Sequence, residues 1–448
     1  MTAALVYGIA VAGDALASEL ARRGWRLVVA DDRPTDEKRA TAARLGAEFV
    51  ASPDAAGIAA LVQSVDMVCP APGVPETHPL IDAAVVAGRP IRTEIDLAYE
   101  WEQERSGGAR PMLAVTGTDG KTTTTMLTAH LLAAAGHRPA AVGNTEVPLV
   151  ASLHDDVDVF AVECSSFRLQ WTESFRAESS VWLNLAPDHQ NWHRSMASYE
   201  QAKARMWAHR RPGDVAIGFV DDPVVMRHLR AVGGRTRTFG RDGADYRLDG
   251  DHLVGPQGRL ARVDRLPRSL PHDITNSLAA AALVLESGLA TVDAVSEGLA
   301  TFRHPPHRIE PLGTVGGVQW FNDSKATTPH AALAALRGFE RVVLLAGGRN
   351  KGLDLSSLAT ERARVKAVVG LGEAGPEVTA AFGGSCPTVL ASSMRDAVEQ
   401  ARRIAEPGDV VLLSPACASF DWYPDGGYPA RGDDFRRCVR ELVAGASS

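Results

Sequence analysis

The segment GTDGKTT at residues 117–123 holds the residue types and spacing that point most directly to chemistry. It lies between a predicted strand over 113–115 and a predicted helix over 124–135. Glycines let backbone N–H groups approach phosphate oxygens, a helix N-terminus favours anions, and Lys121 adds positive charge. The hydroxyl of Thr122 can bind the Mg²⁺ that bridges phosphates. The full G-x-x-x-x-G-K-T pattern has Gly where this chain has Val115, so the alternative is a glycine-rich turn; the flanking elements favour a phosphate site.

Two further side chains could belong to such a site. Glu163 ends a predicted strand, and ligands of open α/β sheets collect at the carboxyl ends of the strands. Its carboxylate could bind Mg²⁺, which prefers oxygen ligands, although an exposed or helix-capping Glu is the simpler interpretation of that residue alone. Lys203 lies in the helical stretch YEQAKAR and, read alone, is a solvated surface lysine.

His189 and His193 are spaced i,i+4 in the segment DHQNWH. On a helix that spacing could bind zinc, but no third ligand of suitable type is visible, and nearby Pro187 and Trp192 argue against a helix. The alternatives are a loop histidine and, for His189, a contact to Mg²⁺ or phosphate.

Three polar segments follow three predicted strands near the C-terminus. They are NDSKATT at 322–328, GGRNKG at 347–352 and SPACAS at 414–419. Each alone could be a turn, but the ends of parallel strands share one edge, so together they predict a binding face. Cys417 has no nearby partner that would make it a nucleophile and is expected to be a packed thiol.

The N-terminal segment GIAVAG at 8–13 resembles a dinucleotide fingerprint with Ala10 in place of the second Gly. Asp31 follows about twenty residues later, as a ribose-binding acid would. The Ala leaves less room for a pyrophosphate, so we do not infer NAD.

These segments require strands alternating with helices, which predicts an α/β fold with parallel sheets and right-handed crossovers. The polar stretch 102–111 reads as a linker and the Pro-rich stretch 302–308 as an extended hinge. We therefore expect three domains: a Rossmann-like domain at 1–105, a P-loop ATPase-like domain with a parallel or mixed sheet at 111–302, and a second Rossmann-like domain at 305–448. Residues 233–260, rich in Gly, Arg and Asp, read as loops or short hairpins.

Composition restricts the function classes. The 448 residues are 45% hydrophobic and 23% charged, typical of a globular protein. A net charge of −7 lacks the basic footprint of a nucleic-acid binder. Five Cys without a C-x-x-C pair fit a reducing compartment. The N-terminus has no basic region typical of a signal peptide, and no run of about 18 apolar residues predicts a membrane span.

Order and spacing together are more specific than any single motif. GTDGKTT, ECSSF, NLAPDH, YEQAKA, HDITN, HR, NDSKATTP, GGRNKG and SPACASFD follow one another along nearly the whole chain. In this order they resemble the Mur ligase family. The resemblance implies an ATP-dependent acid–amino-acid ligase of peptidoglycan precursor synthesis, a monomer in the cytoplasm that acts on small molecules and on neither nucleic acid nor membrane. ECSSF, NDSKAT and SPACASFD followed by Arg431-Gly432 favour the member that adds D-glutamate to UDP-N-acetylmuramoyl-L-alanine through an acyl phosphate.

The resemblance also implies roles for individual residues. Lys121, Glu163, His189 and Lys203 would be catalytic, and Thr122, Glu163, His189 and Lys203, as a carbamate, would bind two Mg²⁺ ions. The remaining implied residues fall into three groups. ATP would contact Gly117, Thr118, Asp119, Gly120, Lys121, Thr122, Thr123, Asn276, Arg308 and Asp323; the UDP-muramoyl substrate would contact Asp31, Asp32, Ala71, Pro72, Gly73, Asn144, Ser165 and Arg168; glutamate would contact Thr327, Lys351, Ser419 and Tyr428.

The chain departs from the family pattern at three places: Asp119 replaces the usual Asn, Thr145-Glu146 follows Asn144 where a Gly-containing pair is usual, and Arg168 replaces Gln. These departures bear on substrate specificity more than on the reaction class. The alternatives are a sister ligase that adds L-glutamate or another amino acid, a folate-type ligase, and a non-catalytic nucleotide-sugar binder. The N-terminal nucleotide unit argues against the folate case, and the intact Lys121, Glu163, His189 and Lys203 argue against the binder.

Overall fold

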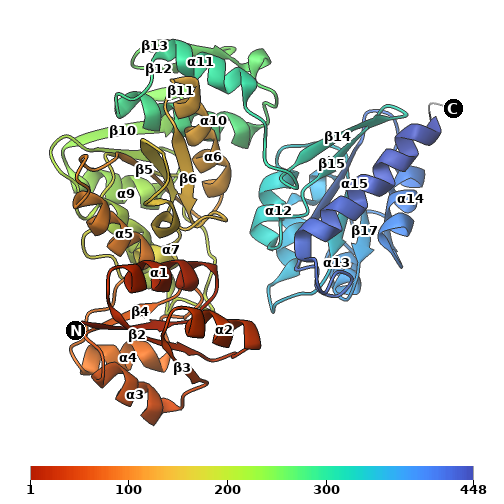
Figure 1. Cartoon of the computed structure of the whole chain (residues 1–448). Helices are drawn as coiled ribbons and strands as arrows, with labels where there is room; N and C mark the ends of the chain where they lie inside the picture. Colours follow the sequence, from red (N-terminus) through yellow and green to blue (C-terminus); the bar gives the residue numbers. More distant parts are fainter. Residues whose placement is uncertain (1, 447–448) are drawn as a thin grey trace. The chain divides into compact units, whose positions relative to one another are not determined.

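The computed structural model describes residues 2–446 and divides into two compact units. The first comprises residues 1–269 and 273–302, and the second comprises 270–272 and 303–448 (Figure 1). The α/β class predicted from the sequence is confirmed: three sheets, mostly of parallel strands, alternate with helices.

The first sheet has four parallel strands in the order β3-β2-β1-β4. The strands are β1 (Ala3–Tyr7), β2 (Arg26–Asp31), β3 (Glu48–Ala51) and β4 (Met67–Pro70), and the helices are α1 (Val11–Arg22), α2 (Asp36–Arg44), α3 (Ala55–Gln63) and α4 (Pro79–Val86). The fingerprint turn joins β1 to α1. A Cβ on Gly13 would lie 2.0 Å from the Gly8 carbonyl oxygen, so close packing of the turn on the helix requires glycine there.

The second sheet has nine strands in the order β13-β12-β11-β10-β9-β8-β5-β7-β6. Their bounds are β5 (Met112–Thr116), β6 (Pro139–Gly143), β7 (Val159–Glu163), β8 (Ser179–Trp182), β9 (Val215–Phe219), β10 (Arg235–Gly240), β11 (Tyr246–Asp249), β12 (His252–Gly255) and β13 (Gly258–Arg262). β11 to β13 pair antiparallel and the rest pair parallel. Segment 233–260 therefore extends the sheet and holds the short hairpins that were one of its two expected forms.

The helices of this region are α5 (Glu94–Gln103), α6 (Lys121–Ala134), α7 (Ser166–Leu169), α8 (Met196–Ala204), α9 (Pro223–Val232), α10 (Pro271–Glu286) and α11 (Val292–Thr301), with 3₁₀ turns η1 (Leu149–Ser152), η2 (Arg205–Trp207) and η3 (Val263–Arg265). Four consecutive alanines of α10, at 279–282, are fully buried. A helix that is apolar around most of its surface must be covered on all sides, and small side chains let α10 approach its neighbours closely. β8 ends at Trp182, and Asn184, two residues later, is hydrogen-bonded to the GTDGKTT loop.

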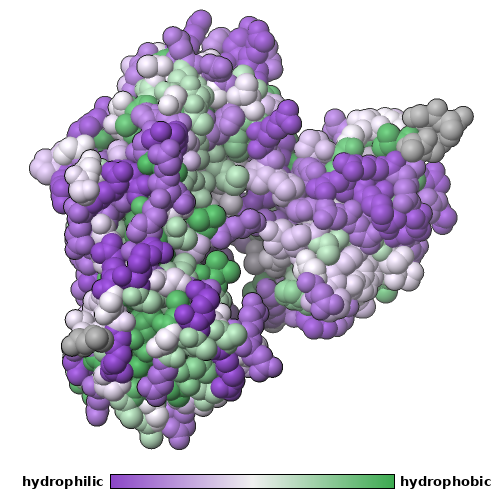
Figure 2. Space-filling view, in the orientation of Figure 1, coloured by the Kyte–Doolittle hydropathy of each residue, from purple (hydrophilic) through white to green (hydrophobic). Residues whose placement is uncertain are grey.

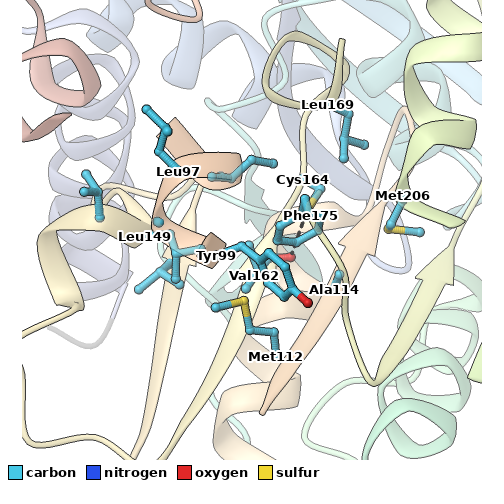
Figure 3. Close-up of a cluster of buried hydrophobic side chains, with 14 of the residues drawn as sticks. Leu97, Tyr99, Met112, Ala114, Leu149, Val162, Cys164, Leu169, Phe175 and Met206 are labelled. Atoms are coloured by element: carbon cyan, nitrogen blue, oxygen red, sulfur yellow. Dashed lines mark hydrogen bonds between the residues drawn. The ribbon is translucent and has the colours of Figure 1, made fainter. Parts of the chain in front are cut away.

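Helix α5 joins the first two sheets into one unit. Its Leu97 and Tyr99 belong to a buried cluster with Met112, Val162 and Phe175 of the second sheet region (Figure 3). Glu102 near its end forms a buried ion pair with Arg110. The stretch 102–111 thus begins inside a docked helix, and the division of residues 1–302 into two domains stays a prediction.

The second unit has six strands in the order β14-β15-β19-β16-β17-β18. They are β14 (Glu310–Val315), β15 (Val318–Asn322), β16 (Val342–Gly347), β17 (Val365–Leu371), β18 (Thr388–Leu390) and β19 (Val410–Ala416), parallel except for the β14–β15 pair. The helices are α12 (Pro329–Leu336), α13 (Gly375–Ala381), α14 (Met394–Ile404) and α15 (Gly427–Ala446), with the 3₁₀ segment η4 (Leu355–Arg364). Apolar clusters on both faces bury the sheet.

The visible face of this unit around α15 is mostly hydrophilic (Figure 2). Arg437 of that helix pairs with Asp434 and Glu441 at i,i+3 and i,i+4 spacing. Within residues 2–446 no helix is long and apolar enough to cross a membrane.

Candidate functional site

The GTDGKTT loop connects β5 to α6. Gly120 caps the helix at φ 78°, a left-handed conformation that favours glycine, and Lys121 begins the helix. The Lys121 Nζ donates to the Thr118 carbonyl oxygen at 2.8 Å, so the ammonium lies over the loop. Thr122 is half-buried and Thr123 buried in the first turn. A glycine-rich loop that leads into a helix N-terminus presents backbone N–H groups suited to phosphate oxygens.

Asn184 holds this loop, and sequence reasoning gave it no role. Its Oδ1 accepts from the backbone N–H groups of Thr118 and Asp119, both at 2.9 Å, and its Nδ2 donates to the Asp119 carbonyl oxygen at 3.3 Å. The one available signal was its position in the motif NLAPDH, directly after a strand. Asn184 therefore fixes the conformation in which the loop could receive a phosphate.

Asn276 packs beneath the same loop. Its Oδ1 accepts from the Thr124 hydroxyl at 3.3 Å and would lie 2.7 Å from a Cβ on Gly120. The predicted contact of Asn276 with adenine stays a prediction; the described contacts connect its amide to the phosphate loop.

Glu163 ends β7 and is 1% exposed. Its Oε1 accepts from the Asn144 Nδ2 at 3.1 Å, whereas its Oε2 is buried and has no hydrogen-bond partner among the described residues. A buried carboxylate oxygen without a partner is costly, and a cation would remove that cost. The interpretation of Glu163 as an exposed residue is wrong.

Lys203 on α8 is also 1% exposed, so the interpretation as a solvated surface lysine is wrong. Its Nζ donates to the Gly117 carbonyl oxygen at 2.6 Å and lies 4.5 Å from the centre of the Tyr199 ring. Burial, together with the charge of Lys121, holds the pKa of Lys203 well below its usual range. The charges of Asp188, Asp119 and Glu163 oppose that shift. A lowered pKa favours the neutral amine form of a buried lysine, which is the nucleophilic form.

His189 has φ 54° and therefore does not continue a helix to His193. Its ring contacts Phe167 and Tyr199. Burial lowers the pKa of His189 to about 4; Asp188 opposes this effect, and the charges of Lys121 and Lys203 add to it. His189 is thus a neutral imidazole close to both lysines.

His193 is used elsewhere: its ring nitrogens bond Glu76 and Ser166. Burial lowers its pKa although Glu76 opposes the shift. In the part of the chain that the structure describes, no group of three His, Cys, Asp or Glu side chains could hold a metal. The zinc interpretation of the histidine pair therefore has no geometric support.

The residues expected to hold the UDP nucleotide lie together at the end of the first sheet. The Asp31 carboxylate accepts from the Ile9 and Arg33 N–H groups at 3.0 and 2.8 Å and from the Lys38 Nζ at 2.8 Å. Burial would raise the pKa of Asp31, but these three donors outweigh it and lower the pKa. Through its bond to Ile9, Asp31 holds the GIAVAG turn at residues 8–13 against the end of β2.

Asp32 is more exposed and accepts from the Tyr7 hydroxyl at 2.5 Å. The Ala71 N–H donates to the Tyr7 carbonyl oxygen, which brings the 71–73 turn, containing Pro72 and Gly73, beside the end of β1. Asp32 and this turn form the more accessible part of the expected nucleotide site.

Ser165 and Arg168 begin and line the short helix α7. The Ser165 Oγ accepts from the Arg168 N–H at 3.4 Å, and the Arg168 guanidinium pairs with Glu94, both side chains being buried. The charge of Arg168 is therefore neutralised within the protein. Its predicted contact with substrate stays a prediction.

In the second unit the three polar strand ends lie side by side. The Ser414 Oγ donates to the Asp323 Oδ2 at 2.7 Å, the Ala416 N–H donates to the Ala326 carbonyl oxygen at 2.9 Å, and Arg349 and Ala418 exchange backbone bonds. Arg431 is buried and donates to the carbonyl oxygens of Ser324, Cys417 and Ala418. Cys417 is buried and its pKa is raised by desolvation, as expected for a packed thiol.

The expected glutamate residues are distributed around these strand ends. The Ser419 Oγ is buried and, within the described residues, has no hydrogen-bond partner. Thr327 is half-buried and Lys351 is exposed, and the Lys325 Nζ lies 5.3 Å from the centre of the Tyr428 ring on α15. Arg308 and Asp323, which are expected to contact ATP, lie close to each other in the same unit. The N–H of Ile309, the residue after Arg308, donates to the Asp323 Oδ1 at 3.2 Å.

Comparison with known proteins agrees with this architecture. A model of the Mur ligase middle domain matches residues 115–284, and one of the Mur ligase glutamate ligase domain matches residues 307–417. The UDP-N-acetylmuramoylalanine--D-glutamate ligase of Frankia casuarinae is 42% identical over 97% of this chain and 93% of its own length. That of Streptomyces avermitilis is 38% identical over 98% of both chains.

Solved structures share the fold at low sequence identity. A pseudomurein peptide ligase type C of Methanothermus fervidus has a TM-score of 0.61 at 15% identity and covers 99% of this chain and 100% of its own. UDP-N-acetylmuramate-alanine ligase of Thermotoga maritima has a TM-score of 0.59 at 19% identity and covers 98% and 99%. The matched domain models and the full-length identity to curated ligases together show that this chain belongs to the Mur ligase family.

Proposed function

We propose that the protein joins D-glutamate to UDP-N-acetylmuramoyl-L-alanine in an ATP-dependent reaction of cytoplasmic peptidoglycan precursor synthesis, and that it does so as a monomer. The observation that carries the proposal is the presence, in one unit, of a phosphate loop, a buried lysine bonded to that loop and a buried Glu163 oxygen that has no partner among the described residues. The names of the full-length relatives at 42% and 38% identity supply the substrate.

The chemistry follows from the poor reactivity of a carboxylate. The substrate carboxylate attacks the γ-phosphorus of ATP, ADP leaves, and an acyl phosphate forms. The amine of glutamate then attacks the acyl carbon and loses a proton, and inorganic phosphate leaves through a tetrahedral intermediate. Lys121 and the N–H groups of the loop stabilise charge on the transferring phosphoryl group.

The residues present fit Mg²⁺. Thr122 and Glu163 would hold one ion, and His189 with a carbamate on Lys203 would hold a second. These are oxygen and neutral imidazole donors, and Glu163 Oε2 is a buried acceptor that has no partner in the part of the chain that the structure describes. When bound, Mg²⁺ would neutralise charge on the phosphate oxygens. The lowered pKa of Lys203 favours its neutral amine, which can add carbon dioxide and release a proton to give an anionic carbamate that ligates through oxygen.

The second unit would supply the amino-acid site. Lys351 offers a cation for a carboxylate of glutamate, and Thr327 and Ser419 offer hydroxyl donors. The buried Ser419 Oγ supports this assignment because a substrate oxygen would complete its hydrogen bonding.

Phosphate release from purified protein with ATP and Mg²⁺ tests the proposal. We expect release that depends on both UDP-N-acetylmuramoyl-L-alanine and D-glutamate, with a glutamyl adduct as the product. Release with L-glutamate alone would indicate the sister ligase, and the chirality of the product would confirm it. Absence of release with any amino acid, while the nucleotide sugar still binds, would indicate a non-catalytic binder and overturn the proposal.

A further inference from the structure

A line of buried polar contacts connects the loop at 71–78 to the turn that carries Glu163. Glu76 lies on this loop, three residues after the 71–73 turn. His193 and Ser166 lie in the region of the second sheet. The three side chains are buried, with 7%, 3% and 1% of their surface exposed. None of them has a part in the reaction described above.

The contacts form a chain with a defined direction. The Glu76 Oε2 lies 3.2 Å from the His193 Nδ1, and the His193 Nε2 lies 2.9 Å from the Ser166 Oγ. A carboxylate only accepts hydrogen bonds, so the Nδ1 of the neutral ring carries the proton and the Nε2 accepts from the Ser166 hydroxyl. Ser166 is too deeply buried to attack a substrate, so the arrangement orients groups and does not form a nucleophile.

Each end of the chain is attached to a part of the proposed site. At one end, the Glu76 N–H donates to the Trp192 carbonyl oxygen at 3.1 Å and the Trp192 Nε1 donates to the Pro72 carbonyl oxygen at 2.9 Å. At the other end, Ser166 follows Glu163 by three residues. The carbonyl oxygen of the intervening Cys164 accepts from the Oγ1 of Thr116, the residue directly before the phosphate loop, at 2.7 Å.

We propose that Glu76 is a positioning residue that couples the loop at 71–78, which would contact the nucleotide sugar, to Glu163 through His193 and Ser166. The inference rests on the proposed function for its kinetic readout. The loop must be ordered for the substrate to lie on the 71–73 turn, and the ordered loop presents Glu76 to His193. His193 then fixes Ser166 and with it the turn that aims Glu163.

The surroundings offer a matched control. The Glu76 Oε2 also accepts from the Ser198 Oγ at 2.6 Å and from the Arg194 N–H at 3.3 Å, and the Arg194 guanidinium contacts Glu76 as well. Outside this group, the exposed Asp82 of α4 accepts from the Arg194 guanidinium at 2.8 Å. Asp82→Ala therefore removes an outer tether between α4 and the Arg194 segment but leaves the buried contacts of Glu76 in place. Glu76→Gln keeps an acceptor oxygen in place, and Glu76→Ala removes it.

We expect Glu76→Ala to lower kcat about tenfold with the KM for ATP unchanged, and both Glu76→Gln and Asp82→Ala to stay within about threefold of the parent. In a double-mutant cycle, Glu76→Ala combined with Ser166→Ala should be no slower than the slower single variant, because both interrupt one chain. Equal losses in Glu76→Ala and Asp82→Ala, or multiplicative losses in the double variant, would overturn the proposal.

A readout independent of ligase activity separates this inference from the proposed function. The ¹⁵N spectrum of the His193 imidazole in the parent protein should show a protonated Nδ1 and an unprotonated Nε2, and Glu76→Ala should give a mixture of tautomers. A parent ring protonated at Nε2 would refute the chain of contacts even if the protein is an active ligase. The expected spectrum without turnover would leave the geometry supported and refute the proposed function.

Discussion

Replacing Asn184 by Ala tests whether one side chain holds the phosphate loop in its binding conformation. The amide makes two bonds of 2.9 Å to loop N–H groups and a third, longer bond of 3.3 Å to a loop carbonyl oxygen. A hydrogen bond contributes about 0.5–1.5 kcal/mol net, so the two short bonds stabilise the loop by roughly 1–3 kcal/mol.

That free energy sets the size of the expected effect on ATP. Since 1.4 kcal/mol corresponds to a factor of ten in binding, Asn184→Ala should weaken ATP binding by about 5- to 150-fold. The substitution would loosen only the loop that follows β5 and not the sheet itself, so the protein should remain folded. Asn184→Asp keeps the two accepted bonds but adds a negative charge beside the triphosphate and should weaken ATP binding as well.

Isothermal titration with a non-hydrolysable ATP analogue, alongside a thermal unfolding curve, measures both quantities. Asn191→Ala is the control, because Asn191 is an exposed asparagine of the same segment after β8. If Asn184→Ala bound the analogue within twofold of the parent, the loop would keep its conformation without this side chain and the reasoning would be wrong.

Three other substitutions have outcomes that follow from single contacts. Lys203→Ala should abolish turnover, with partial recovery on addition of a short carboxylic acid that enters the space left by the buried side chain; a full rate in the variant would refute the carbamate role. Gly432→Ala would bring a Cβ to 2.2 Å from the buried His307 Nδ1. The overpacking cost of about 1–3 kcal/mol should exceed the helix-propensity gain of about 1 kcal/mol, so the unfolding temperature should fall. The same change in a His307→Ala background should not lower it, and equal shifts in both backgrounds would contradict this reasoning. Burial would raise the pKa of Asp409, but Lys366, the Glu406 N–H and Arg341 outweigh burial and lower the pKa. The ionised carboxylate therefore stabilises the fold fully above the unfolded-state pKa of about 4, and this stabilisation is lost as the pH falls through the lower folded-state pKa. Asp409→Asn should reduce the free energy of unfolding at pH 7 but much less in acid, which denaturant curves at several pH values would measure.

The parts of the fold that follow from local rules could be predicted from the sequence. Alternating apolar runs and helical spacing give the parallel sheets, and glycine spacing before Lys121 gives the phosphate loop. The segment 233–260 was harder because its strands are short and rich in Gly and Arg. They are held by Glu286 of α10, which accepts from Arg235, Arg237 and the Tyr246 hydroxyl. That partner lies about 40 to 50 residues away, beyond the reach of local pattern.

The chemical state of the site depends on contacts that are distant in sequence. A lysine in a polar helix reads as solvated, yet Lys203 is buried because α8 packs against a loop 86 residues earlier. Glu163 reads as an exposed or capping residue, yet it is buried and its Oε2 has no hydrogen-bond partner within residues 2–446. Residue type identified these positions as candidates, but burial, which lowers the pKa of Lys203 and makes an unpaired Glu163 oxygen costly, is a property of the tertiary fold.

Arg168 shows why a departure from a family pattern needs its structural partner before it can be interpreted. Beside ECSSF, an arginine in place of glutamine reads as an extra cation for an anionic substrate. The buried carboxylate of Glu94 already neutralises it, and Glu94 also accepts from the Val150 N–H at 2.7 Å. Removing one member of a buried pair leaves an uncompensated charge at a cost of about 3–5 kcal/mol. A loss of activity on changing Arg168 alone would therefore report the docking of α5 on the central sheet, and only a paired change of Glu94 and Arg168 that preserves stability could reveal an effect on substrate choice.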